Sequence, residues 1–262
     1  MIGIPLGRHA PALDAVRALR TKSGRRDQGR FAVEGATLLA EALSAGCVPL
    51  AVYATPRGLE AVAGQAVPAE RIFAIDERAM ARLSDVETPP GVLAVFPTVF
   101  RTLDDLLSRG EPALVLAGIA DPGNAGTLLR SAEIFGIRQA IFAREAVEPY
   151  NPKVVRATMG AIFRMALATA DAGDLVASAR ERAYTLVAAA RDGVALPDFI
   201  FPERTLVAVG NERLGVAAWL PHYDAGVAIP QTGRGESLNA SVAGGIILYA
   251  FSQQFSGRTF DS

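Results

Sequence analysis

Short apolar runs alternate with amphipathic segments along the chain, and this pattern predicts two regions of mixed strands and helices. In the first region the predicted elements are strands at 30–34, 48–54, 71–75 and 91–96 and helices at 11–22, 36–45, 57–63 and 77–83. Residues 23–29, rich in Gly, Arg and Asp, are expected to form a loop. Alternation of this kind indicates a small α/β unit.

The second region opens with a near-continuous apolar run at 113–118, typical of a strand buried on both faces of a parallel sheet. Further elements are predicted as strands at 139–143, 184–190, 205–209 and 227–229 and helices at 124–135, 173–182 and 238–251. We therefore expect an α/β protein with domains at residues 1–97 and 112–262, joined by a linker at 98–111.

The C-terminal helix has an unusual composition. Ser237 is a natural N-cap for it, because its hydroxyl can accept from a free amide of the first turn. Asn239, Ser241 and the pair Gly244-Gly245 interrupt the apolar face that follows. Such residues suggest that another backbone or a ligand comes close to the helix, although an ordinary helix with two tolerated glycines would show the same pattern.

The stretch IPQTGRGESLNASVA, residues 229–243, resembles the third motif of the SpoU-type (TrmH-like) RNA ribose methyltransferases of the SPOUT superfamily. Asn124-x-Gly126 followed by Arg130 matches the first motif of that family. Gly210-Asn211-Glu212, which follows a predicted strand, matches the second, although Arg213 stands where the family usually has glycine. RFAVEG and SDVETPPGVLAVF resemble the substrate-binding N-terminal domain of the same enzymes, a ribosomal-protein-like fold.

This resemblance implies S-adenosylmethionine-dependent 2′-O-methylation of a ribose in RNA, ribosomal RNA more than transfer RNA. It also implies a deep trefoil knot in the C-terminal segment and a homodimer with its sites at the interface. The residues that would contact the methyl donor, mostly through backbone groups, are Gly210, Ile229 and Leu238. The residues that would form the reaction centre are Asn124, Arg130, Glu212, Ser237 and Asn239.

Two of these residues also have local interpretations. Asn124 can cap the helix that Gly136 closes, and Arg130 either pairs with Glu133 on the surface or faces a phosphate. A guanidinium stays protonated in proteins. We therefore expect Arg130 to neutralise a phosphate rather than to act as the general base.

Four cations are candidates for RNA contact. Arg25 and Arg26 belong to a basic N-terminal cluster, and Lys153 and Arg156 share one face of a helix that starts at Pro152 with Asn151 as its cap. A solvated basic face is the alternative for both groups. The net charge of −1 argues against a nucleic-acid coat protein, which would be basic over its whole surface.

The remaining composition restricts the chemistry. A single cysteine, Cys47, forbids an internal disulfide, and the two histidines, His9 and His222, provide no metal-ligand cluster. No apolar run reaches the roughly 18 residues of a membrane span, and the N-terminus lacks the order of a signal peptide. We expect a cytoplasmic protein without metal.

Two other classes of protein remain to be weighed. An RNA-binding assembly factor could keep the fold without the reaction, but it would have no reason to keep Asn124, Arg130, Glu212 and Asn239 together. A nucleotide-dependent oxidoreductase would need a G-x-G-x-x-G after a strand, and the sequence has none.

Overall fold

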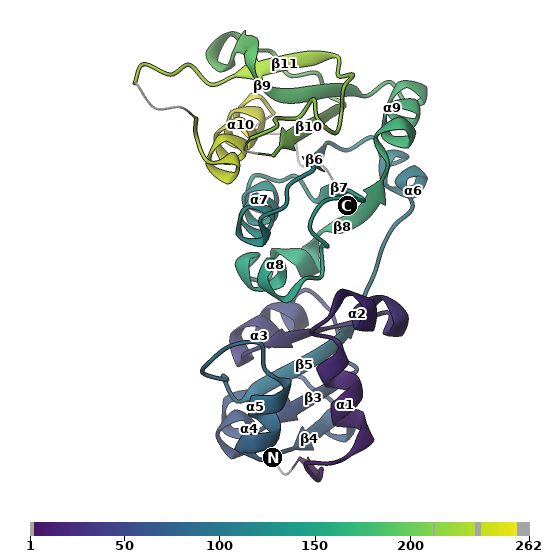
Figure 1. Ribbon diagram of the computed structural model, residues 1–262, viewed down its shortest axis with the longest axis vertical. Helices are drawn as coiled ribbons and strands as arrows, with labels where there is room; N and C mark the ends of the chain where they lie inside the picture. Colours follow the sequence, from purple (N-terminus) through teal and green to yellow (C-terminus); the bar gives the residue numbers. More distant parts are fainter. Residues whose placement is uncertain (1–2, 212, 234–236, 256–262) are drawn as a thin grey trace. The chain divides into compact units, whose positions relative to one another are not determined.

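Two sheets, each with helices packed against it, form the computed structural model (Figure 1). The residues that it describes are 3–211, 213–233 and 237–255. The chain divides into two compact units, residues 1–99 with 150–163 and residues 100–149 with 164–262. The first boundary falls at the predicted linker, 98–111. Segment 150–163 groups with the first unit, which differs from the continuous second domain expected from the sequence.

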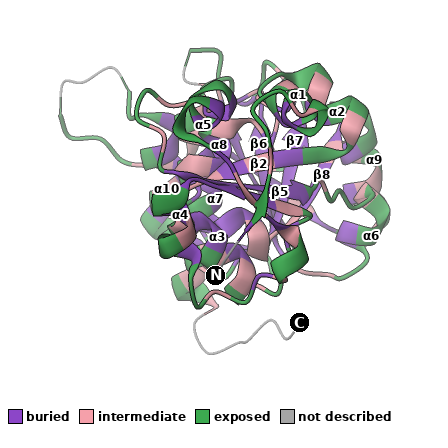
Figure 2. Cartoon of the chain, turned by 90° about the horizontal axis from the view of Figure 1, so that it is seen from below, coloured by how far each residue is buried: buried purple, intermediate pink, exposed green. Residues whose placement is uncertain are grey.

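The first unit holds a five-stranded sheet in the order β1-β4-β3-β5-β2, in which β5 is antiparallel to both of its neighbours. Its elements are β1 (Ile4–Pro5), α1 (Pro11–Ala18), α2 (Lys22–Gln28), β2 (Arg30–Glu34), α3 (Ala36–Ser44), β3 (Ala51–Ala54), α4 (Pro56–Val62), a 3-10 turn (Ala69–Arg71), β4 (Ile72–Ala74), α5 (Glu77–Leu83), β5 (Val92–Pro97) and α8 (Pro152–Ala157). Apolar side chains of α1, α5, β3 and β5 form a core, and Figure 2 shows β5 buried in the interior.

Segment 150–163 is tied to the first unit through Tyr150. Its hydroxyl donates to the carbonyl of Val99 at 2.7 Å and accepts from the Val99 amide at 3.0 Å. Its ring lies 4.5 Å from that of Phe31 on β2, measured between centroids. Burial raises the pKa of Tyr150 to about 12, so the hydroxyl stays neutral and keeps both hydrogen bonds.

Residues 22–28 form a helix, α2, where the sequence predicted a loop. Thr21 caps it by accepting from the Gly24 amide at 3.1 Å, and Gly29, with φ of +61°, ends it. Gly24 is a typical loop residue, but a Cβ there would lie 2.0 Å from the Ala18 carbonyl oxygen. The glycine therefore permits close contact between α1 and α2. The helix predicted at 11–22 ends at Ala18, and α2 begins at Lys22.

The expectation that Arg25 contacts RNA is corrected by its burial. Its side chain is 3% exposed, and Nη1 donates to the Leu19 carbonyl at 2.8 Å. The guanidinium holds α1 and α2 together instead of facing solvent. A basic residue in a polar stretch predicts exposure on average, but here the close helix pair encloses it.

The second unit holds a six-stranded, all-parallel sheet in the order β11-β9-β10-β6-β7-β8. Its elements are α6 (Leu103–Leu107), β6 (Ala113–Ala117), α7 (Pro122–Ile134), β7 (Gln139–Ala143), β8 (Ala166–Ala170), α9 (Ala172–Glu181), β9 (Thr185–Ala195), a 3-10 turn (Leu196–Asp198), β10 (Thr205–Gly210), β11 (Ala225–Ala228) and α10 (Ala240–Gln254). The predicted parallel sheet is confirmed. β8 was not predicted, and β9 extends to Ala195, beyond its predicted end at 190.

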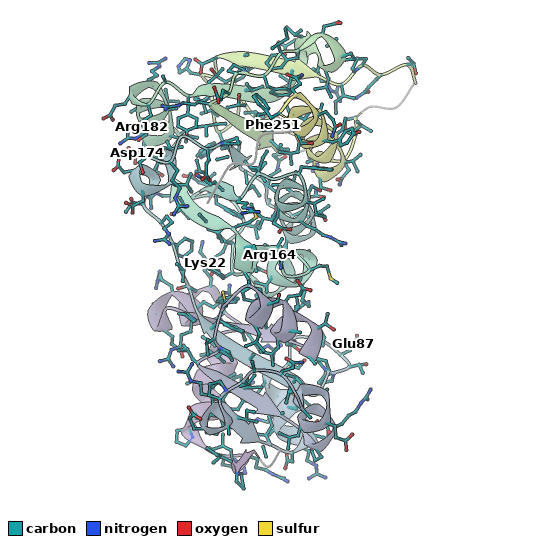
Figure 3. The ribbon with its side chains drawn as sticks, turned by 180° about the vertical axis from the view of Figure 1, so that it is seen from behind. Lys22, Glu87, Arg164, Asp174, Arg182 and Phe251 are labelled. Atoms are coloured by element: carbon teal, nitrogen blue, oxygen red, sulfur yellow. The ribbon has the colours of Figure 1, made fainter. Side chains whose placement is uncertain are left out.

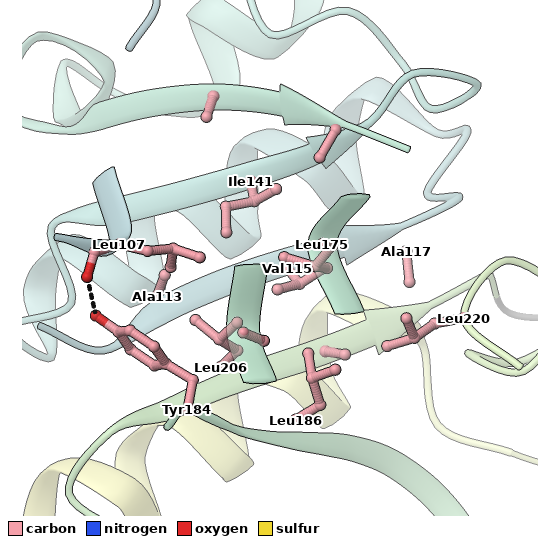
Figure 4. Packing of buried hydrophobic residues seen from close by; sticks show 14 of the residues in the cluster. Leu107, Ala113, Val115, Ala117, Ile141, Leu175, Tyr184, Leu186, Leu206 and Leu220 are labelled. Carbon is pink, nitrogen blue, oxygen red and sulfur yellow. Dashed lines mark hydrogen bonds between the residues drawn. The ribbon is translucent and has the colours of Figure 1, made fainter. Parts of the chain in front are cut away.

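One core of this unit lies under α6 and α9 (Figure 4). Branched side chains of the central strands fill it, among them Val115 of β6 and Ile141 of β7, neither of which has exposed surface. Tyr184 closes its edge, since its hydroxyl donates to the Leu107 carbonyl at 3.2 Å (Figure 4). The core therefore sits between these two helices and one face of the sheet.

The C-terminal helix α10 packs on α7 and β10. A Cβ at Gly244 would lie 2.3 Å from Leu128 Cδ2 of α7 and 3.1 Å from Val209 Cγ2 of β10. The sequence predicted that another backbone or a ligand comes close to this helix, whereas at Gly244 the close atoms belong to side chains of the same unit. On its buried face, Phe251 packs edge-on against Phe201, with ring centroids 5.4 Å apart (Phe251 is labelled in Figure 3).

Candidate functional site

A cavity of about 1020 Å³ lies where β10 and β11 end, beside the first turns of α10. Ligands of parallel sheets bind outside the carboxyl ends of the strands, so the position is a usual one for a site. Gly210, Ile229 and Leu238, the three residues expected to contact a methyl donor, all line it, and so does Ser237. The structure therefore brings the second and third motif regions to one cavity.

Gly210 ends β10 under a tight loop. A Cβ at this position would lie 2.3 Å from the Val216 amide nitrogen, so no other residue fits without moving the loop. Asn211 shapes that loop, because its Oδ1 accepts from the amides of Arg213 at 3.0 Å and Leu214 at 3.3 Å. Arg213, which stands where the family usually has glycine, lines the cavity. Glu212, expected in the reaction centre, lies outside the described residues.

Asn239 is the N-cap of α10, which corrects the expectation for Ser237. Its Oδ1 accepts from the amides of Ser241 at 2.9 Å and Val242 at 3.3 Å, and from the Ser241 hydroxyl at 2.6 Å. Ser237 lies two residues before the cap and lines the cavity. Both residue types cap helices well, so local preference did not decide between them.

The same asparagine links the two motif helices. Its Nδ2 donates to Oδ1 of Asn124 at 3.0 Å, across 115 positions of sequence. Asn124 is not the cap of α7, although the sequence suggested that role. Asp121 is the cap, because its Oδ1 accepts from the Asn124 amide at 2.8 Å. The side chain of Asn124 instead accepts from Asn239, and the N-termini of α7 and α10 meet at this bond.

Arg130 stands apart from this pair. An α-helix rises about 1.5 Å and turns about 100° per residue. Arg130, six residues after Asn124, therefore lies roughly 9 Å further along α7 and on a different side of the helix from Asn124. It is exposed, and it is not among the described residues that line the cavity. The alternative pairing with Glu133 does not occur among the described ion pairs, where Glu133 accepts from Arg164 Nε at 2.8 Å.

The basic residues expected to contact RNA differ in their surroundings within the first unit. Lys153 is exposed on α8, whose predicted cap Asn151 and first residue Pro152 are confirmed. Arg156 lies 3.4 Å from Asp85, so part of its charge is balanced there. Arg26 is exposed and pairs only with its neighbour Asp27 among the pairs described, at 3.1 Å.

Two residues at the cavity were missed by the sequence interpretation. Between Gly226 and Val227 the register of β11 against β9 shifts, and the part of β9 that loops out there carries Arg191 and Asp192 to the cavity wall. Gly193 makes this possible, since a Cβ there would lie 2.3 Å from the Gly226 carbonyl carbon. The run Arg-Asp-Gly after a strand is a turn signal that could have indicated the bulge.

Metal and membrane features were searched over the part of the chain that the structure describes. There, no three His, Cys, Asp or Glu side chains come together as metal ligands. None of the helices in that part has the length and apolar character needed to cross a membrane.

Similar proteins match over both units. Residues 111–249 match the model of the SpoU rRNA Methylase family, and residues 11–94 match the MRM3-like substrate binding domain. The 23S rRNA (uridine(2479)-2′-O)-methyltransferase of Streptomyces viridochromogenes is 37% identical over 183 residues, which cover 66% of this chain and 64% of that protein. The 23S rRNA (guanosine(2553)-2′-O)-methyltransferase RlmP of Bacillus subtilis is 26% identical over 89% of this chain and 92% of its own length.

Solved structures agree with these matches. An AdoMet-bound rRNA methyltransferase from Sinorhizobium meliloti superposes with a TM-score of 0.84 at 26% identity, covering 96% of this chain and 98% of its own. The SpoU methyltransferase AviRb from Streptomyces viridochromogenes, in complex with AdoMet, has a TM-score of 0.82 at 28% identity, covering 95% of this chain and 100% of its own. The predicted resemblance to this family is confirmed, and the chain belongs to the SpoU rRNA methylase family.

Proposed function

We propose that the protein transfers a methyl group from S-adenosylmethionine to the 2′-oxygen of a ribose in ribosomal RNA. One observation carries this proposal. Residues of the second and third motifs line a single cavity beside the first turns of α10, the helix whose cap Asn239 bonds Asn124 of the first motif. The two relatives described above are named as 23S rRNA 2′-O-methyltransferases, which favours ribosomal RNA as the substrate class.

The cavity suits a methyl donor of this size. Its volume is at the upper end of the roughly 300–1,000 Å³ of small-molecule sites. Apolar residues that line the cavity, such as Val209, Val227 and Ile247, suit an adenine ring, while the loop after Gly210 offers backbone polar groups. When bound, S-adenosylmethionine supplies a methyl group on a positively charged sulfur. We infer that the backbone of Gly210, Ile229 and Leu238 holds it.

The reacting ribose would be positioned by the joined helix ends. The N-termini of α7 and α10 carry partial positive charge, which favours an RNA phosphate and a hydroxyl that is losing its proton. The Asn124–Asn239 bond holds the two ends together. Ser237 on the cavity wall would contact the substrate side, and Glu212 is proposed for the reaction centre from its place in the second motif. In-line placement of the two reacting atoms would provide most of the rate gain.

A homodimer explains the position of Arg130. The outer face of α10 exposes Val242, Ile246 and Tyr249, and α7, which packs against α10, exposes Ile134. An apolar face of this kind marks an interface, and a two-fold pair of copies would cover it in both. Arg130 lies one turn before Ile134 on the same side of α7. We infer that it neutralises a phosphate in the partner's site, which accounts for its absence from the cavity of its own chain.

Three further expectations belong to this proposal. The knot remains a prediction, supported by the tight seating of Gly244 between α7 and β10. Arg26 and Lys153 remain predicted RNA contacts of the first unit, with Arg156 beside Asp85 as a weaker one. A cytoplasmic location also remains a prediction.

The experiment that tests the function is methyl transfer in vitro. Purified protein is incubated with methyl-labelled S-adenosylmethionine and either ribosomal RNA or transfer RNA, and binding of the donor is measured by calorimetry. We expect label in ribosomal RNA only. Label in transfer RNA alone would assign the other substrate class. An assembly factor would bind RNA while neither binding the donor nor transferring label.

A further inference from the structure

Residues 189–193 of β9 leave the regular pattern of the sheet beside the cavity. Ala188 pairs with Gly226 of β11, and the next pair along the two strands joins Val194 to Val227. Residues 189–193 therefore have no register partner on β11. The pairing of β9 with β10 also ends at Ala188. All the residues of this bulge line the cavity: Ala189, Ala190, Arg191, Asp192 and Gly193.

The bulge is part of the construction of the cavity. A bulge bends its strand and changes the direction of the side chains that it carries. Close backbone contact fixes this one, since a Cβ at Gly193 would lie 2.3 Å from the Gly226 carbonyl carbon. On the other side of the bulge, Val209 and Gly210 pair with β6 but have no register partner on β9. Both residues line the cavity instead.

The bulge brings opposite charges to the cavity on adjacent residues, Arg191 and Asp192. Asp192 carries the only carboxylate among the described residues of the lining. Within the described part of the chain, no hydrogen bond or ion pair engages this carboxylate. A second guanidinium lines the same cavity on Arg213. The described wall therefore offers guanidinium groups to an anion and a carboxylate to a cation.

S-adenosylmethionine presents groups of both signs to such a wall. Its methionine part carries an α-ammonium group and a carboxylate, and its sulfur is a positively charged sulfonium. The methyl group on the sulfonium has to face the ribose oxygen that attacks it, in line with the sulfur that leaves. The α-ammonium group takes no part in the reaction. It is therefore the cation of the donor that a fixed carboxylate can bind before and after methyl transfer.

We propose that Asp192 binds the α-ammonium group of the methyl donor, as a side-chain contact in addition to the backbone contacts proposed above. The ammonium group donates a hydrogen bond to the carboxylate, and a charge-assisted hydrogen bond of this kind is stronger than a neutral one. The inference rests on the proposed function, because it needs the donor in this cavity. The product, S-adenosylhomocysteine, keeps the ammonium group and is held by the same contact.

Two other groups of the donor are alternative partners for the carboxylate. The ribose hydroxyls of the adenosine part can donate hydrogen bonds, and the sulfonium attracts a nearby anion. Three ligands distinguish these partners. S-adenosylmethionine carries all of them, and S-adenosylhomocysteine lacks the charge on the sulfur. Methylthioadenosine keeps the ribose hydroxyls but lacks the whole amino-acid part.

The test is calorimetric titration of the wild-type protein and of Asp192→Ala with each of the three ligands. We expect the variant to bind S-adenosylmethionine and S-adenosylhomocysteine roughly 5- to 20-fold more weakly, between the effect of an exposed ion pair and that of a strong hydrogen bond between charged groups. Its affinity for methylthioadenosine should be unchanged. Asp192→Asn keeps an acceptor oxygen but loses the charge, so its affinity for the first two ligands should lie between those of Asp192→Ala and the wild type.

Asp174→Ala is the matched control. Asp174 (labelled in Figure 3) is an exposed aspartate in the first turn of α9 and is not among the described residues that line the cavity. This variant should bind all three ligands as the wild type does. The melting temperature of Asp192→Ala should stay near the wild-type value, because Asp192 is exposed. An equal loss of affinity in Asp174→Ala would show a general effect of charge and overturn the proposal.

The pattern of losses identifies the group that Asp192 binds. Weaker binding of all three ligands by Asp192→Ala would assign the carboxylate to the ribose hydroxyls, and weaker binding of S-adenosylmethionine alone would assign it to the sulfonium. Either result, or no loss at all, overturns the proposal while the proposed function stands. A wild-type protein that binds none of the ligands contradicts the proposed function, and the inference falls with it. If Asp192→Ala does not fold, the same comparison is decided with Asp192→Asn.

Discussion

Replacing Asn239 separates two roles of one side chain. Its Oδ1 caps α10 through the amides of Ser241 and Val242, and its Nδ2 donates to Asn124 on α7. Alanine removes both roles. Serine keeps an oxygen that caps a helix as well as asparagine does, but it has no amide group with which to bond Asn124.

The two variants should differ in stability and agree in activity. Loss of an N-cap costs about 1 kcal/mol, within a range of about 0.5–2, and 1 kcal/mol lowers Tm by about 2–4 °C in a domain of this size. We therefore expect Asn239→Ala to melt about 2–4 °C below the wild type and Asn239→Ser to melt close to it. Both should lose roughly 100-fold in kcat, the effect of misplacing the reacting groups by about 1 Å.

The assay is methyl transfer to ribosomal RNA, with Tm from calorimetry and donor affinity from titration. Affinity for S-adenosylmethionine should stay near the wild-type value in both variants, because Asn239 is not among the described residues that line the cavity. A serine variant with wild-type kcat would show that the link between the helices is not needed. An alanine variant with wild-type Tm would contradict the capping role.

Three other substitutions test separate parts of the structure. Arg130→Ala should abolish turnover and spare donor binding. Mixing it with Gly210→Val, whose side chain would displace the loop beside the cavity, should restore part of the activity in heterodimers. No restoration would contradict an arginine that acts in the partner's site. Gly244→Leu should lower the free energy of unfolding by at least about 1–3 kcal/mol, because even a Cβ at this position would lie 2.3 Å from Leu128. An unfolding midpoint in denaturant equal to that of the wild type would refute the tight packing. Burial raises the folded-state pKa of Tyr150 to about 12 from its ordinary 10. The stability that its neutral hydroxyl contributes is therefore present below pH 10 and is lost as pH rises from 10 to 12, by up to about 2–3 kcal/mol. The free energy of unfolding of Tyr150→Phe should depend less on pH in that window.

Elements with strong local signals were predictable from the sequence. The strands at 30–34 and 139–143 and the helix at 77–83 have the predicted bounds. The first alternates between more and less buried residues, the second is largely apolar, and the third is a periodic segment capped by Asp76. β8 was missed since its sequence, ALATA, is only weakly apolar and is stabilised by pairing with β7. The order of the six strands depends on long-range packing, which no local pattern shows.

The residues of the candidate site, like the elements of the fold, could be predicted only in part. Resemblance to the motifs of the family indicated Gly210, Ile229 and Leu238, and the structure places all three on one cavity. The caps of α7 and α10 were assigned to the wrong residues, because each helix start offers several cap-forming side chains. The caps are Asp121 and Asn239. Charge alone also misplaced Arg25, whose burial depends on the close contact of two helices.

The measurement that tests the central claim most directly locates the transferred methyl group. Ribosomal RNA labelled by the protein is hydrolysed in alkali, which cleaves next to a free 2′-hydroxyl but not next to a methylated one. We expect the label in alkali-resistant dinucleotides, at one position, and none with Arg130→Ala. Label released in mononucleotides would place the methyl group on a base and contradict the account.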